Sequence, residues 1–152
     1  MKKWLIVVLS ILSFAACISP FIIVPKLNDV YAQSLADEMK KANLPGQTEI
    51  VAMIWDCVNT SGTGNHTEAW VVMLIKTELA REELVEYYKW LYINAYKIDV
   101  YEVTEDEKST LAMNIAQKNF QSLENIQNHN GYYIIERAER NEFYSFFDLR
   151  GH

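Results

Sequence analysis

The C-terminal stretch FFDLRGH gathers a carboxylate, a guanidinium and an imidazole within five residues. In an extended strand, Asp148 and Arg150 lie on the same face, and His152 follows them if the strand continues. Such groups suit acid–base catalysis or ligand binding. The alternative interpretation is an Asp–Arg ion pair that holds the last strand, because structural ion pairs outnumber catalytic ones. These three residues, with the more distant His66, are therefore weak catalytic candidates.

The other motifs predict neither a metal site nor a cofactor. The three histidines of the chain are His66, His129 and His152, and no H-x-x-x-H or C-x-x-C spacing brings zinc ligands together. The G-x-G in CVNTSGTGNHT lacks the lysine of a phosphate-binding loop and is more typical of a flexible hairpin loop. We expect no bound metal and no cofactor.

The two cysteines fall in different parts of the chain. Cys17 lies inside a long apolar run, which leaves Cys57 alone in the folded part and excludes an internal disulfide framework. On a strand, Cys57 shares a face with Met53 and Trp55, which favours an inert core residue over a nucleophile.

Tyrosine and tryptophan are abundant after residue 50, and exposed aromatic rings are one means of binding carbohydrate or peptide. Most of these rings fall on faces that the apolar pattern assigns to the core, so packing accounts for most of them. They are Trp55, Trp70, Trp90, Tyr87, Tyr88, Tyr92, Tyr132 and Tyr133.

The N-terminal segment predicts a membrane anchor. From Trp4 to Val24 there are 21 residues without a charge, and a helix of that length just spans a hydrocarbon core about 30 Å thick. Lys2 and Lys3 precede the run, so the positive-inside bias places the N-terminus in the cytoplasm and the domain outside.

Two other interpretations of this segment remain open. The first is a secretory signal cleaved after Val30–Ala32, although the apolar region is longer than usual for one. The second is lipoprotein processing at Cys17, which follows the small residues Ala15 and Ala16. All three interpretations deliver the domain to the same side of the membrane.

Charge is distributed unevenly and argues against nucleic-acid binding. All 20 acidic residues but only 12 of the 14 basic residues follow the apolar run, which gives that part a net charge near −8. An acidic domain of this kind is repelled by phosphate backbones.

Two helices are predicted by apolar residues at three- and four-residue spacings. The first covers residues 27–42, and Pro45 and Gly46 end it, because proline interrupts a helix and glycine permits a turn. The second covers residues 81–96 and carries two acidic residues in its first turn, where they meet the positive end of the helix dipole.

Strands are predicted by β-branched and aromatic runs. Residues 48–58 and 69–77 are apolar on both faces, as central strands are, and a polar loop joins them as an antiparallel hairpin. Residues 97–105 are half polar and fit a place nearer a sheet edge. Residues 132–138 and 142–149 flank Glu-Arg-Asn and predict a closing hairpin.

The predicted fold class is α+β: an N-terminal transmembrane helix, then one domain with an antiparallel sheet packed by two main helices. Residues 1–25 form the anchor or signal and residues 26–152 the domain. Within it, residues 106–127 mix strand-like and helix-like spacings and are left unassigned.

The spaced pieces LPGQTEIV, IKTELAREELVEYY, YYII and DLRGH give the chain a resemblance to a known group. It resembles small, uncharacterised membrane-anchored or lipoprotein-like proteins of Gram-positive bacteria, over roughly residues 27–152. The resemblance implies the envelope location and the one-domain architecture, and it implies no activity, catalytic residue or cofactor.

The expected function is therefore a membrane-tethered binding or interaction domain without catalytic activity. It contacts the membrane through residues 4–24 and has a protein or cell-envelope partner. The alternative function is a small extracytoplasmic hydrolase or ligand-binding enzyme that uses the C-terminal Asp-Leu-Arg-Gly-His segment. A subunit of a larger membrane assembly is a third hypothesis.

Overall fold

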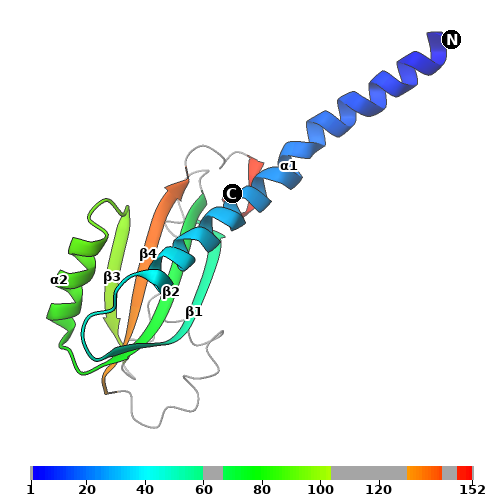
Figure 1. Ribbon diagram of the computed structural model, residues 1–152. Helices are drawn as coiled ribbons and strands as arrows, with labels where there is room; N and C mark the ends of the chain where they lie inside the picture. The colour runs from blue at the N-terminus through cyan, green and yellow to red at the C-terminus, as the bar shows by residue number, and fades with distance from the viewer. Residues whose placement is uncertain (1, 60–66, 104–129, 142–146, 152) are drawn as a thin grey trace.

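The computed structural model describes residues 2–59, 67–103, 130–141 and 147–151, and it consists of a long helix, a four-stranded sheet and a second helix (Figure 1). The predicted α+β class, with an antiparallel sheet packed by two helices, is confirmed. The unassigned segment 106–127 lies outside the described residues.

Helix α1 runs from Lys2 to Lys41 without a break and joins the predicted anchor to the predicted first helix of the domain. Its N-terminal half projects away from the sheet (Figure 1). The most apolar 18-residue window of this helix has a mean hydropathy of 2.6 and none of it is buried, so by length and composition the helix can cross a membrane.

Two prolines, Pro20 and Pro25, lie inside α1. Proline lacks the N–H that would bond the carbonyl four residues earlier, which for Pro20 is the carbonyl of Ala16. The Ser19 hydroxyl donates to that carbonyl at 3.1 Å. A neighbouring side chain thus satisfies a group that the proline leaves open, and the helix continues.

The four strands are antiparallel in the order β1-β2-β4-β3. Strands β1 (Thr48–Val58) and β2 (Thr67–Thr77) form the predicted hairpin, and β4 (Tyr132–Asn141) lies between β2 and the edge strand β3 (Lys97–Glu102). The predicted place of β3 near an edge is confirmed.

One face of the sheet packs against both helices. α1 contributes Ala32, Leu35, Ala36 and Met39, and α2 (Arg81–Leu91) with the residue after it contributes Leu84, Tyr88 and Tyr92. They meet inward-facing strand residues that include Val71, Met73, Ile75, Val100 and Ile135. The C-terminal third of α1 is therefore part of the hydrophobic core.

The opposite face of the sheet carries a second buried cluster, formed by Trp70, Val72, Leu74, Val103, Ile134 and Ala138. Strand β2 contributes to both clusters and is buried along almost its whole length. The prediction of a central strand covered on both sides is confirmed for β2. It is wrong for β1, which lies at the edge and is half exposed.

Two other boundaries differ from the predictions. Helix α2 ends at Leu91 and not near residue 96, because Tyr92 leaves the helical conformation with φ −119° and ψ 46°. The turn predicted at Glu-Arg-Asn is also wrong, since β4 continues to Asn141, which pairs with Thr67 of β2.

A core substitution tests whether α1 belongs to the folded domain. Met39 is 1 % exposed, and Met39→Ala is expected to lower the free energy of unfolding by about 2–5 kcal/mol through lost burial and a residual cavity. Urea unfolding in detergent, followed by circular dichroism, measures it. Lys40→Ala, an exposed neighbour, is the control and should change stability by less than about 0.5 kcal/mol; equal effects of the two variants would contradict the described packing.

Candidate functional site

The predicted candidates Asp148 and Arg150 lie together at the C-terminal end of the described chain. The segment there is a short 3-10 helix, Leu149–Gly151, so the expectation of an extended strand is wrong. The side chains still meet, because Arg150 Nε and Nη2 donate to the two Asp148 oxygens at 2.9 and 2.7 Å. His66 and His152 lie outside the described residues.

This pair is fastened to α1. Asn28 Nδ2 donates to Asp148 Oδ2 at 2.7 Å, while Arg150 Nη1 lies 2.6 Å from Asp29 Oδ1 and its Nη2 donates to the Pro25 carbonyl at 3.1 Å. We call Asn28, Asp29, Asp148 and Arg150 the C-terminal cluster. Its contacts tie the last described residues to the turn of α1 that follows the apolar run. Figure 1 shows the C-terminus beside this part of α1.

The environment keeps Asp148 ionised. Burial alone would raise the pKa of its carboxyl, but hydrogen bonds from Arg150 and Asn28 outweigh burial and lower that pKa. The same bond to Asp148 raises the pKa of Arg150. A carboxylate that accepts several bonds and holds no proton is a poor general acid, so the geometry favours an ion pair that fastens the chain end.

Cys57 lies beside this cluster and is fully buried. Its thiol donates to the Asn28 carbonyl at 3.1 Å, and burial raises its pKa to about 12. A thiol with such a pKa is a weak nucleophile near neutral pH. This agrees with the interpretation of Cys57 as an inert core residue.

A second polar cluster lies on the opposite face of the sheet around Glu136, which is 2 % exposed. Its carboxylate accepts hydrogen bonds from Trp70 Nε1 at 2.8 Å, Lys97 Nζ at 2.9 Å and the Tyr101 hydroxyl at 3.0 Å. Burial is the main cause that raises the pKa of Tyr101. With every oxygen partnered, this cluster fits a structural network.

A third cluster, which the sequence did not reveal, surrounds Arg137 on β4. A groove of about 520 Å³ runs between α1 and the connection from α2 to β3, and we call it the Arg137 groove. Arg137 is 7 % exposed, and its guanidinium lies 4.2 Å from the ring centre of Tyr92. Glu38 from α1 and Glu139 from β4 form ion pairs with it at 3.1 and 3.0 Å.

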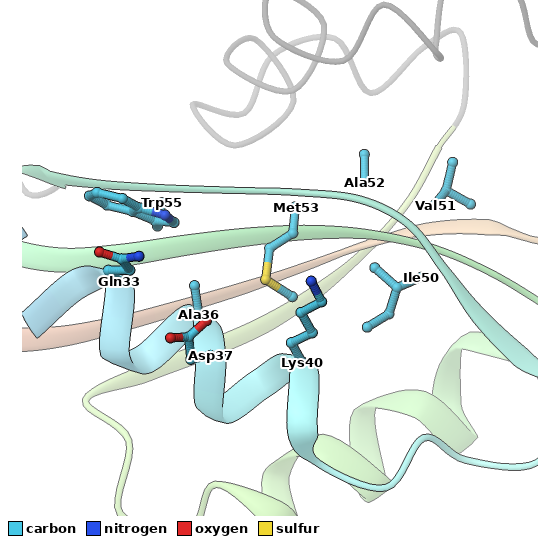
Figure 2. A pocket seen from close by; sticks show the side chains of 9 residues that line it. All are labelled: Gln33, Ala36, Asp37, Lys40, Ile50, Val51, Ala52, Met53 and Trp55. Carbon is cyan, nitrogen blue, oxygen red and sulfur yellow. The ribbon is translucent and has the colours of Figure 1, made fainter. Parts of the chain in front are cut away.

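A fourth feature is a hollow of about 430 Å³ between α1 and the edge strand β1 (Figure 2). Gln33, Asp37 and Lys40 line it from the helix, and Ile50, Met53 and Trp55 from the strand. Trp55 is 39 % exposed there. The hollow combines an apolar floor with charged helix side chains.

Within the described ranges, no group of three or more His, Cys, Asp or Glu side chains is arranged to hold a metal ion. No protein-family model, curated protein or solved structure matches the chain.

Neutralising Asp148 tests the C-terminal cluster. Asp148→Asn removes a buried carboxylate from Arg150 and is expected to cost about 1.5–3 kcal/mol of unfolding free energy, the range for hydrogen bonds to charged groups. Because the folded-state pKa of Asp148 is lowered, its contribution is fully present above its unfolded pKa of about 4 and is lost as pH falls through the lower folded-state pKa. Urea unfolding in steps from pH 7 to pH 2 should show a difference between the two proteins that is constant above about pH 4 and shrinks as the pH falls further.

Asp56→Asn is the matched control. Its carboxylate lies 3.7 Å from Arg150 Nη1 and its side chain is 57 % exposed, so the same substitution should have almost no effect. A pH-independent loss in Asp148→Asn would contradict the assigned ion pair.

Proposed function

We propose that this chain is a membrane-tethered binding domain. Residues 4–24 of α1 anchor it in the bilayer, and the α+β domain lies outside the cytoplasm, where it binds a protein or cell-envelope component without catalysing a reaction. The observation that carries the proposal is the continuity of α1, which is one unbroken helix from Lys2 to Lys41. The same helix supplies the apolar run and one layer of the core, so no flexible linker separates the anchor from the domain.

The structure of α1 supports an anchor that is retained and not cleaved. Ala32 is fully buried, and Asn28 is fully buried and bonds to Asp148. Cleavage between Ala32 and Gln33 would remove both residues together with Asp29, which pairs with Arg150. A secreted domain that begins at Gln33 would lose a turn of its core helix and three partners of its C-terminal end.

Lipoprotein processing at Cys17 makes a different demand. Val24 is the first residue of α1 that is buried in the domain, so a chain that begins at Cys17 keeps every contact of the core. A lipid attached to Cys17 would then hold the domain at the membrane in place of a transmembrane helix.

A binding role is favoured over the hydrolase alternative by the contacts of Asp148 and Arg150. Both side chains are engaged with each other and with α1, so neither presents a free group for acid–base work.

The proposed orientation in the membrane rests on Lys2 and Lys3, which precede the apolar run and favour a cytoplasmic N-terminus.

Intact-mass measurement tests the anchor. We expect a protein extracted from membranes to retain residues 1–32, apart from processing of the initiator methionine, because the fold uses Asn28, Asp29 and Ala32. Protease added to intact cells should digest the domain, and protease added to inverted vesicles should not. Loss of 32 residues would show a cleaved signal, and diacylglycerol on Cys17 a lipoprotein.

Cross-linking in native membranes tests the binding role. A photoreactive residue at Ile93, which is 77 % exposed beside the Arg137 groove, should capture a discrete partner or envelope component. The same group at Glu49, an exposed position at the far end of β1, is the control. If neither position captures a partner, the proposed binding role is contradicted. Partners that co-purify with the protein in a fixed ratio in mild detergent would instead indicate a subunit of a larger assembly.

A further inference from the structure

The C-terminal segment of the chain contacts the apolar run of α1. The ring of Phe147 packs edge-on against the ring of Phe21, with 5.4 Å between the ring centres, and Val24 is only 7 % exposed. Phe21 and Val24 both belong to the uncharged run from Trp4 to Val24. The domain and the run therefore overlap by about one turn of helix.

The length of the run fixes the depth of this overlap. As a helix the run spans about 31 Å, which only just matches a hydrocarbon core about 30 Å thick. If the turn that carries Phe21 and Val24 stayed outside the lipid, about 25 Å of apolar helix would remain, and the bilayer would have to thin to match it. With the whole run in lipid, Phe21 lies at the boundary of the hydrocarbon, and Phe147, whose ring touches it, lies at the same boundary.

Exposed apolar side chains gather at this level of the molecule. Leu149 is 69 % exposed, although Arg150 beside it bonds to the Pro25 carbonyl, one residue beyond the run. On α1 itself, Ile22 and Leu27 are exposed as well. Single exposed apolar residues are common on protein surfaces, but a group of them that continues an apolar run extends the surface that lipid can cover.

The polar groups of the segment are paired within the protein. Asp148 accepts hydrogen bonds from Arg150 and Asn28, and the other side-chain bonds of Arg150 go to Asp29 and the Pro25 carbonyl. Charges that are already paired cost less to bring near hydrocarbon than charges that need water. The C-terminal cluster can therefore lie next to the hydrocarbon without bringing an unpaired charge of its own to it.

We propose that Phe147 and Leu149 form a second membrane contact, in which Leu149 inserts into the lipid boundary beside α1 and Phe147 packs between Phe21 and the acyl chains. The partner is the lipid surface on the side of the bilayer that carries the domain. The inference rests on the proposed function, because it places these residues relative to an anchor at residues 4–24. Together, the anchor and this contact hold the domain in one orientation against the membrane.

The contact is apolar and needs no anionic lipid. The part of the chain after the run has a net charge near −8, so anionic head groups repel it. Burial of Leu149 and Phe147 in the lipid boundary supplies the attraction instead.

Spin labelling of the full chain in phosphatidylcholine nanodiscs tests the contact. The background is Cys17→Ser, because Cys57 is fully buried and burial raises the pKa of its thiol to about 12, so it should not react with the label. Single cysteines are introduced as Leu149→Cys, Trp90→Cys and Leu12→Cys. Electron paramagnetic resonance then measures collisions of each label with oxygen, which enters the bilayer, and with a water-soluble nickel complex. We expect nickel collisions at position 149 to be about 3- to 10-fold fewer than at position 90, because the polar complex is excluded from apolar surroundings.

Trp90→Cys is the matched control for an exposed apolar position away from the membrane. Trp90 is 77 % exposed and belongs to α2, which lies at the opposite end of the molecule from the N-terminal half of α1 (Figure 1). Leu12→Cys, inside the run, reports on the anchor itself. Because the Leu149 side chain is exposed, its replacement should leave the core intact, and circular dichroism checks that each labelled protein keeps the fold.

The inference is overturned if positions 149 and 90 collide equally with the nickel complex while position 12 is shielded, and the anchor is then unaffected. If position 12 is also open to nickel, the anchor is contradicted and this inference with it. Replacing part of the phosphatidylcholine with phosphatidylglycerol should not increase the shielding at position 149. Shielding that appears only with the anionic lipid would overturn the apolar contact and show attraction by charge.

Discussion

The burial of the C-terminal third of α1 against the sheet is the contact on which the other features depend. Ala32, Leu35, Ala36 and Met39 close one face of the β-sheet core, and the same turns present Asn28 and Asp29 to the chain end and Glu38 to Arg137. Because the same continuous helix carries the apolar run, the contacts of its C-terminal third also fix the direction in which the apolar run leaves the domain. A kink or break in α1 would alter the core, the C-terminal cluster and the Arg137 groove together.

The charged groups at the centres of the polar clusters are buried and paired, which favours structural roles for them. The carboxylates of Asp148 and Glu136 each accept several hydrogen bonds and are nearly inaccessible. Such networks contribute to a unique fold. Around Arg137, the carboxylates of Glu38 and Glu139 share one guanidinium, which is itself buried.

Periodicity and composition were sufficient to predict the apolar helix, the first hairpin, the start of α2 and the α+β class, because these depend on local patterns of apolar residues. The end of α2 at Leu91 was missed because Tyr92 keeps the helical spacing while it turns to support Arg137. The turn at Glu-Arg-Asn was wrong because pairing with β2 extends β4. The Arg137 groove joins residues a hundred positions apart, and its one local signal was an arginine between glutamates in an apolar strand.

The outer edge of β1, which pairs with no further strand in the part of the chain that the structure describes, has a consequence for how copies of this chain meet. β1 is 11 residues long and mostly apolar, with no lysine or proline to block the addition of another strand. Two identical edges join in antiparallel fashion about a two-fold axis perpendicular to the sheet. Since α1 lies flat against a sheet face (Figure 1), that axis reverses its direction. With residues 4–24 as the proposed anchor, copies inserted the same way into one bilayer cannot merge their sheets at β1. The proposed anchor would then protect an edge that a freely diffusing domain would have to protect with charged residues.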